Sequence, residues 1–199
     1  DEYFFIWQVE PTVMLGRNQL LENEINKDYC NQHCVHIFRR KSGGGCVYAD
    51  GGCLQFSYIT SDEGVNFAFD RYIRLVATVL QKLGIDAKSA GRNDITVAGK
   101  KVAGTAFYRI PGRSVLHNTL LFNTNLEELV RCITPSNEKL ISKGVESVRQ
   151  RVTNLCECTQ LTIDELVLQV RKQLCGDKVR SLTAEDMAGV ADIEQVFAS

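Results

Sequence analysis

The sequence predicts an α+β fold with mixed, largely antiparallel sheets packed against helices. Strand-like segments come in turn-linked groups, and helices interrupt those groups irregularly instead of following every strand. The main glycine-rich loop joins one strand-like segment to another. A doubly wound nucleotide-binding fold would instead need a glycine fingerprint between a strand and an immediate helix.

Length and composition fit one domain. The chain has 199 residues, 44% of them hydrophobic, so we expect residues 1–199 to form a single domain with its own core. Lys and Arg total 23 against 24 Asp and Glu, a net charge of −1, which argues against a nucleic-acid partner. The run Val115–Phe122 is too short to cross a bilayer, and no secretory signal opens the chain. We therefore expect no membrane partner and a cytoplasmic location.

The first half predicts strands and two helices. An aromatic, β-branched run predicts a buried strand over Tyr3–Val9. Apolar spacing predicts a helix over Asn18–Tyr29 and a clearer one over Asn66–Leu83, which Gly84 ends. Further strands are expected at Thr12–Leu15, Val35–Arg40, Cys46–Tyr48 and Leu54–Ile59.

The second half continues this pattern. Amphipathic spacing predicts helices over Leu126–Cys132 and Asp164–Leu174, the second capped by Thr162, and a last helix could open at Thr183. Ser136–Asn154 is polar and basic and predicts a long loop, a kind of segment that is often functional. Strands are expected at Ile95–Val97, Lys101–Tyr108 and Ser114–Phe122.

The eight cysteines leave two readings open. Cys30 and Cys34, with His33 and His36 beside them, have the best spacing for a metal, but no second pair completes a zinc site. A domain of this size does not need disulfides, so free thiols in a reducing cytosol are the expected state.

The stretch Arg39–Gly45 is the most informative part of the sequence. Three consecutive glycines let a ligand lie against the backbone, whose N–H groups can bind an anion. The preceding cations suit carboxylate and phosphate oxygens. The alternative is a flexible hairpin loop with solvated charges.

Three other stretches carry candidate chemistry. Lys101 begins a strand of small residues, where an ammonium could neutralise an acyl-phosphate, and Asp94 could hold Mg²⁺. His117 lies between apolar residues, and the basic stretch around Lys143 and Arg149 could close over a phosphate. Each also has a plain interpretation: surface turn residues, a core histidine and a solvated loop.

Taken together and in this order, these stretches resemble the lipoate–protein ligase family. The resemblance covers nearly the whole chain and is strongest from Phe5 to Asn154. It rests on Arg-Arg-x-Ser-Gly-Gly-Gly-x-Val-Tyr-x-Asp from Arg39, Gly-Arg-Asn-Asp from Gly91, Lys-Val-Ala-Gly-Thr-Ala from Lys101, and the basic run from Lys143 to Leu155.

The resemblance implies the biotin/lipoate ligase catalytic fold, which is related to class II tRNA synthetases. Lys101 would be the catalytic residue, contacting the carboxyl and phosphate of the intermediate. Lipoate or lipoyl-AMP would be bound by Arg40, Ser42, Gly43, Gly44, Gly45 and His117. The nucleotide would be bound by Asn93, Asp94, Lys143, Arg149, Val152 and Thr153, with Asp94 also holding Mg²⁺.

The implied reaction is ATP-dependent lipoylation, with ATP and Mg²⁺ as cofactors and lipoate as substrate. Lipoate would be activated to lipoyl-AMP and passed to a lysine of a lipoyl domain, in 2-oxoacid dehydrogenase complexes or the glycine cleavage H protein. Family members usually carry a strand and a helix before the position of Phe5, and a small C-terminal accessory domain. The resemblance thus implies a catalytic domain without both, its accessory domain missing or separate.

Three positions depart from the family pattern: Ala49, Cys53 and Asn118. They leave substrate choice and rate open. The same fold would also allow an ATP-independent octanoyl or lipoyl transferase acting through a cysteine thioester, for which Cys46 is the cysteine nearest the glycine loop. A non-catalytic lipoyl-binding protein is a third possibility, although Lys101 is present.

Overall fold

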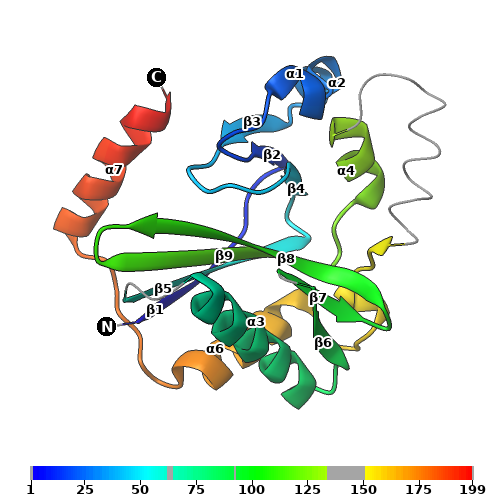
Figure 1. The fold of residues 1–199 in the computed structure, drawn as a ribbon, viewed down its shortest axis with the longest axis vertical. Coiled ribbons are helices and arrows are strands. Elements are labelled where there is room, and N and C mark those ends of the chain that lie inside the picture. The colour runs from blue at the N-terminus through cyan, green and yellow to red at the C-terminus, as the bar shows by residue number, and fades with distance from the viewer. Residues whose placement is uncertain (1, 62–64, 92, 134–150, 199) are drawn as a thin grey trace.

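The computed structural model describes residues 2–61, 65–91, 93–133 and 151–198. It contains a six-stranded sheet with helices α3 and α6 on one face (Figure 1). A smaller three-stranded sheet and helices α1, α2 and α4 lie on the side of the opposite face (Figure 1). The mixed, largely antiparallel α+β architecture predicted from the sequence is confirmed.

The large sheet is antiparallel throughout, with the strand order β1-β5-β9-β8-β7-β6. Its centre is formed by two long strands, β8 and β9, that follow each other across a tight turn. The strands are β1 Tyr3–Trp7, β5 Cys53–Ser61, β6 Ala87–Ala90, β7 Asp94–Val97, β8 Lys100–Ile110 and β9 Arg113–Leu121.

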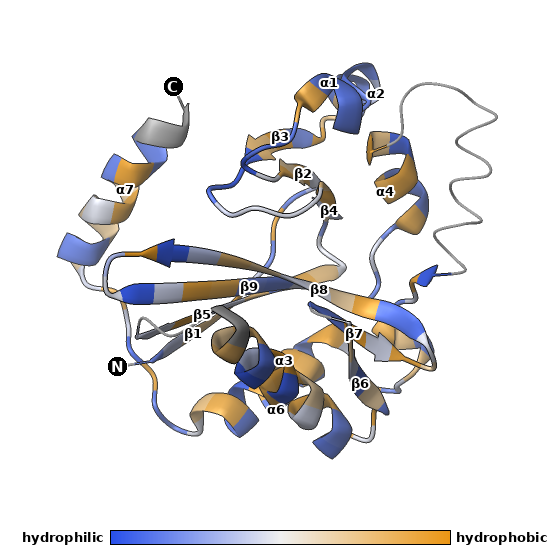
Figure 2. Ribbon diagram, in the orientation of Figure 1, coloured by the Kyte–Doolittle hydropathy of each residue, from blue (hydrophilic) through white to orange (hydrophobic). Residues whose placement is uncertain are grey.

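The main core lies between this sheet and helices α3 (Val65–Lys82) and α6 (Ile163–Cys175). Phe56, Tyr72 and Leu116 are fully shielded from solvent there, and burying such a side chain contributes about 1.5–3 kcal/mol. Figure 2 shows hydrophobic residues running along α6 beneath the sheet. Thr162 caps α6, as the sequence predicts, and the structure shows that it forms a reciprocal capping box with Glu165.

The small sheet has the order β3-β2-β4 and is the mixed part of the fold. Its strands β2 and β3 run parallel, whereas β2 and β4 run antiparallel. A second core cluster holds this sheet against α2 and α4, and a third joins it to β5 and β9 through Met14, Cys53 and Leu121. The bounds are β2 Thr12–Leu15, α1 Leu21–Glu24, α2 Lys27–Gln32, β3 His36–Arg39, β4 Val47–Ala49 and α4 Leu126–Ile133.

Two expectations about the elements are wrong in detail, and one strand has no counterpart among the expected elements. The helix predicted over Asn18–Tyr29 is two short helices, α1 and α2, because Asn26 turns out of the helix and caps α2 through its side chain. The first strand is an edge strand with Phe5 and Trp7 partly exposed, not a buried one. Strand β6 was not anticipated, since Ala-Lys-Ser-Ala carries no strand-forming side chain.

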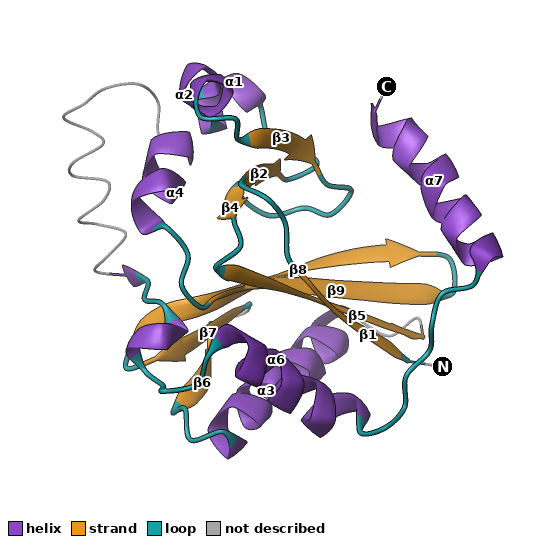
Figure 3. Cartoon of the chain, turned by 180° about the vertical axis from the view of Figure 1, so that it is seen from behind, coloured by secondary structure: helices purple, strands orange, loops and turns teal. Residues whose placement is uncertain are grey.

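The C-terminal part contains a one-turn helix, η1 (Leu155–Glu157), and helix α7 (Ala184–Ala198). Figures 1 and 3 show α7 standing apart from both sheets. No helix in the described residues is long and apolar enough to cross a membrane.

Candidate functional site

The glycine loop between β3 and β4 is held in shape by Arg40. Its guanidinium donates from Nη2 to the carbonyls of Gly43 (2.9 Å) and Gly45 (2.6 Å), and from Nη1 to the carbonyl of Met14 (2.8 Å). Within the described part of the chain, the backbone N–H groups of Gly43, Gly44 and Gly45 form no hydrogen bond. The loop therefore presents backbone donors while Arg40 neutralises its acceptors, as an anion-binding loop requires.

Gly16, at the end of β2, lies directly against this loop. A Cβ on Gly16 would stand 2.0 Å from the carbonyl oxygen of Gly44, and Gly44 itself has a φ of +93°. Both positions therefore require glycine. Gly16 is absent from the sequence-based site; the available signal was a glycine immediately after an apolar strand, which indicates close backbone approach.

Ser42 connects the glycine loop to the large sheet. Its hydroxyl accepts from Arg40 Nε (3.1 Å) and lies 2.7 Å from His117 Nε2 on β9. Since an arginine can only donate and Ser42 is buried, the hydroxyl proton is directed to His117. His117 then accepts at Nε2 and carries its proton on Nδ1. Burial, together with the nearby positive charge of Arg40, lowers the pKa of His117 to about 4.

Lys101 and Asp94 form the charged part of the site. The Lys101 ammonium lies 2.7 Å from Asp94 Oδ1, which is shielded from solvent and has no aligned hydrogen bond in the described chain. Both side chains are about one-third exposed, at 39% and 31%, and such a pair contributes only about 0–1 kcal/mol to stability. Gly104 makes room for it, because a Cβ there would lie 3.0 Å from Lys101 Nζ.

The register of the strands places His117 and the Lys101–Asp94 pair on one face of the large sheet. Ala106 lies opposite His117, while Gly104 lies opposite both Thr119 and Asp94. Opposed residues share a face, and rows two residues apart are separated by about 7 Å. The face is the one turned toward the small sheet, since Leu116 and Leu120 on the other face belong to the main core. His117, the Lys101–Asp94 pair and the glycine loop thus surround one space.

Comparison with known proteins identifies the family of the chain. The sequence model of the lipoyl protein ligase A/B catalytic domain matches residues 1–175. The chain belongs to this family. The resemblance that the motifs suggested is confirmed.

Relatives in the family are named as lipoate–protein ligases. Lipoate–protein ligase 1 of Staphylococcus aureus is 36% identical over 196 residues, covering 96% of this chain and 60% of that protein. Lipoate-protein ligase LplJ of Bacillus subtilis is 38% identical over 158 residues, covering 79% of this chain and 48% of that protein. The chain thus spans about half to three-fifths of the length of these relatives.

Solved structures share the fold. A bipartite lipoate protein ligase of Thermoplasma acidophilum, from a study of that ligase and its E2 lipoyl domain, superposes with a TM-score of 0.91 at 26% identity, over 98% of this chain and 80% of that chain. A lipoate-protein ligase A bound with ATP superposes with a TM-score of 0.87 at 23% identity, over 98% of this chain and 81% of that chain.

Three further residues predicted from the family resemblance lie around β8. Asn93 lies next to Asp94 and donates to the Thr105 carbonyl at 3.3 Å. Val152 pairs with Lys101 in a parallel bridge. The Thr153 N–H donates to the Lys101 carbonyl at 3.1 Å, while its hydroxyl donates to Glu157. Lys143 and Arg149 lie outside the described residues.

The three departures from the family pattern are not at this site. Asn118 points away from it into the main core, where it accepts from the Tyr72 hydroxyl at 3.2 Å. Cys53 and Ala49 are fully buried in the third cluster. These substitutions therefore alter packing beneath the site rather than its lining.

All eight cysteines are unpaired. Among the described residues, no three His, Cys, Asp or Glu side chains are grouped to hold a metal. Burial raises the pKa of the Cys46 thiol to about 12, helped by the Glu24 carboxylate. Cys46 is therefore a poor nucleophile at neutral pH, because the thiolate is the reactive form.

Proposed function

We propose that the protein is an ATP-dependent lipoate–protein ligase. It would activate lipoate to lipoyl-AMP and transfer the acyl group to a lysine of a lipoyl domain. The observation that carries the proposal is the facing arrangement of an anion-binding glycine loop and the Lys101–Asp94 pair, joined across the gap between the sheets by the Ser42–His117 hydrogen bond.

This arrangement suits an acyl-adenylate. The loop N–H groups and the Lys101 ammonium provide fixed positive charge where the carboxylate meets the α-phosphate. Beyond them, His117 is flanked on its own face by two small residues, Ser57 and Ala106. These leave room for an extended hydrocarbon chain next to the neutral imidazole.

The chemistry needs no protein nucleophile. In the first step a carboxylate oxygen bonds to the α-phosphorus of ATP, the bond to the β-phosphate breaks, and pyrophosphate leaves. In the second step the neutral amine of the acceptor lysine attacks the mixed anhydride, AMP leaves with the bonding electrons, and the amine loses a proton as the amide forms. The protein contributes charge neutralisation and positioning.

Mg²⁺ fits one place in this proposal. Magnesium prefers one or two carboxylates together with phosphate oxygens, and Asp94, whose shielded Oδ1 lacks an aligned hydrogen bond, is the carboxylate at the site. When bound, the ion would offset negative charge on the nucleotide phosphates. The same side chain would then be shared between Mg²⁺ and Lys101.

The wider proposal concerns partners and organisation. Acceptors would be lipoyl domains of 2-oxoacid dehydrogenase complexes or the glycine cleavage H protein. Residues 1–199 would act as a single catalytic domain, with an accessory domain as a further partner, either on the same chain or separate. Unpaired cysteines fit a reducing compartment such as the cytoplasm.

A thioester-forming transferase is less well supported, since the raised pKa of Cys46 disfavours its thiolate.

The test of the ligase proposal measures lipoate-dependent pyrophosphate release from ATP with Mg²⁺, and then the mass of an added lipoyl domain. A ligase gives both pyrophosphate and the mass gain of one lipoyl group. Octanoyl transfer from an acyl thioester without ATP, and without pyrophosphate, would instead establish the transferase.

A further inference from the structure

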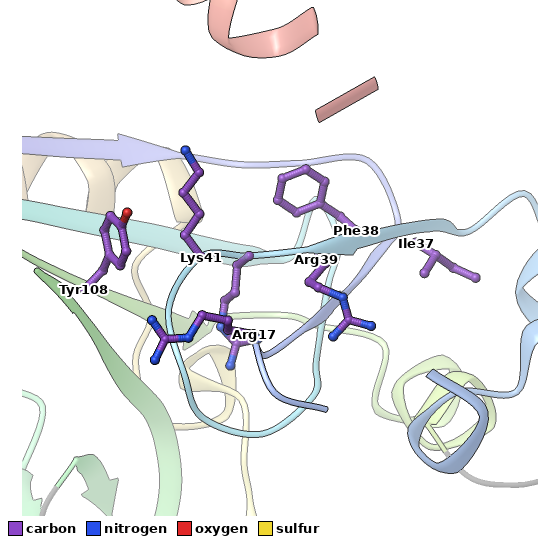
Figure 4. A pocket seen from close by; sticks show the side chains of 7 residues that line it. Arg17, Ile37, Phe38, Arg39, Lys41 and Tyr108 are labelled. Carbon is purple, nitrogen blue, oxygen red and sulfur yellow. The ribbon is translucent and has the colours of Figure 1, made fainter. Parts of the chain in front are cut away.

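A cationic groove lies beside the glycine loop. It has a volume of about 460 Å³ and is lined by Arg17, Ile37, Phe38, Arg39, Arg40, Lys41 and Tyr108. Figure 4 labels all of these side chains except Arg40, and they come from the segment after β2, from β3, from the glycine loop and from β8. Four of the seven lining residues are cations and none is a carboxylate, in a chain whose net charge is −1.

The proposed small substrates do not account for this charge. The Lys101 ammonium lies beside Gly104, and Tyr108 is four residues further along β8, roughly 13 Å at the usual strand rise. A phosphate that meets the Lys101 ammonium is therefore two rows of side chains away from Tyr108. The groove is nearer to His117, because Tyr108 lies one row beyond Ala106, the residue opposite His117. An uncharged acyl tail at that end needs no cations.

The shape of the groove points to a macromolecule. Arg17, Phe38 and Lys41 are all exposed, so cations and an aromatic ring lie together at the protein surface. Interfaces that bind acidic protein surfaces combine aromatic contacts with cations in this way. Arg40 belongs to the groove only as part of the loop, because its guanidinium is hydrogen-bonded to loop carbonyls.

We propose that this groove docks an acidic surface of the acceptor domain that presents the target lysine. The proposal rests on the proposed function and names the surface that recognises the acceptor. A globular domain of about 100 residues has a radius of gyration of about 13 Å, so its width covers the distance from the groove to Lys101. Docking at this groove would also place the acceptor next to the glycine loop that is proposed to hold the adenylate.

The test separates docking from activation. Arg17→Glu reverses a charge in the groove and keeps the backbone N–H that donates to the Ser42 carbonyl at 2.9 Å. Arg171→Glu is the matched control, since Arg171 is exposed on α6 beneath the opposite face of the sheet. For each protein, pyrophosphate release without acceptor and KM for an unmodified lipoyl domain are measured at several salt concentrations.

Arg17→Glu is expected to leave acceptor-independent pyrophosphate release within about twofold, to raise KM for the lipoyl domain about tenfold, and to weaken its salt dependence. Arg171→Glu should change none of these. An unchanged KM in Arg17→Glu overturns the proposal. A parallel loss of pyrophosphate release also overturns it, because the groove would then serve the small substrates.

Failure of the proposed function is distinguishable from failure of docking. If the wild-type protein releases no pyrophosphate, the ligase proposal fails by itself. The affinity of the unmodified lipoyl domain is then measured directly by titration calorimetry with wild type and Arg17→Glu. Equal affinities, or no binding to the wild type, overturn the docking proposal as well.

Discussion

At the residue scale, Arg40 has a structural role in addition to the ligand-binding role that the family resemblance predicts. The family resemblance puts it among the lipoyl-adenylate contacts, yet in the structure its donors hold three backbone carbonyls and the Ser42 hydroxyl. A lysine could not span these acceptors, because it has one nitrogen where arginine has a planar fork of three. Arg40 therefore fixes the loop geometry and, through Ser42, the proton position on His117.

The depressed pKa of His117 predicts a specific pH dependence of stability. The pKa falls from 6.5 to about 4 on folding, so between these values the unfolded chain binds a proton that the folded protein does not. The contribution of His117 to the free energy of unfolding is therefore fully present above pH 6.5 and is lost as the pH falls toward 4. The shift corresponds to about 2–3 kcal/mol between pH 7 and 4.5.

Urea unfolding of wild type and His117→Gln at pH 7 and 4.5 checks this expectation. The glutamine can still accept from Ser42 but does not titrate. Between pH 7 and 4.5 the free energy of unfolding should fall by about 2–3 kcal/mol more in the wild type than in His117→Gln. Equal losses in the two proteins would mean that His117 titrates normally in the fold.

The structure brings together several side chains that the sequence singles out as site candidates. Lys101 and Asp94 were singled out and lie 2.7 Å apart, and Ser42 and His117, from distant segments, share a hydrogen bond. Gly16 could not be found this way, because its importance depends on which backbone it meets in three dimensions. Tyr108 and Arg17 were missed for the same reason: a groove exists only after β8 and the loop are brought together.

At the element scale, the join between β2 and the glycine loop predicts a steric effect. Gly16→Ala would put a Cβ 2.0 Å from the Gly44 carbonyl oxygen, and backbone there cannot yield as a side chain can. We expect the loop to be displaced and kcat/KM for lipoate in pyrophosphate release to fall at least about tenfold, because misplaced binding groups lose catalytic orientation. Steady-state kinetics measure this.

Gly51→Ala is the matched control, since Gly51 has no atom within 4 Å of its would-be Cβ and no positive φ. It should retain activity within about twofold, as a surface substitution without such features usually does. A Gly16→Ala protein with wild-type kinetics would show that the loop does not depend on this contact.

Element prediction failed where local pattern and tertiary context disagree. Apolar spacing over Asn18–Tyr29 is helical, but Asn26 offers its side chain as a cap and breaks the segment into α1 and α2. Strand β6 has no propensity signal and forms because β7 offers it an edge. The parallel pairing of β2 with β3 was equally hidden, since α1 and α2 intervene in sequence.

At the scale of the whole molecule, the candidate site is built from both sheets. The large sheet supplies Asp94 from β7, Lys101 from β8 and His117 from β9. The small sheet supplies the glycine loop between β3 and β4. The hydrophobic cluster that contains Met14, Cys53 and Leu121 packs the small sheet against the large one and so holds the two halves of the site together. Neither sheet alone contains the site.

Helix α7 contributes little to this body. No described side chain between Ala184 and Gln195 is buried. Removing residues 181–199 should therefore shift the melting temperature by less than about 3 °C, because hardly any packed apolar surface is lost. Differential scanning calorimetry measures the shift.

Removal from Ile163 onward provides the contrast. That deletion takes away the buried Leu166 and Val170 of α6 and should unfold the protein at ordinary temperature, since each such loss costs about 2–5 kcal/mol. A large drop in melting temperature after removal of residues 181–199 alone would show that α7 packs against the body in solution.

The central claim is that Lys101, paired with Asp94 opposite the glycine loop, promotes adenylation. The most direct measurement is lipoate-dependent pyrophosphate release by wild type and Lys101→Ala, with thermal unfolding of both. Loss of one positioned charge that stabilises the transition state costs about 10²–10³ in rate, so release should fall by at least that factor while the melting temperature stays close to wild type. Normal pyrophosphate release by a folded Lys101→Ala protein would contradict the account.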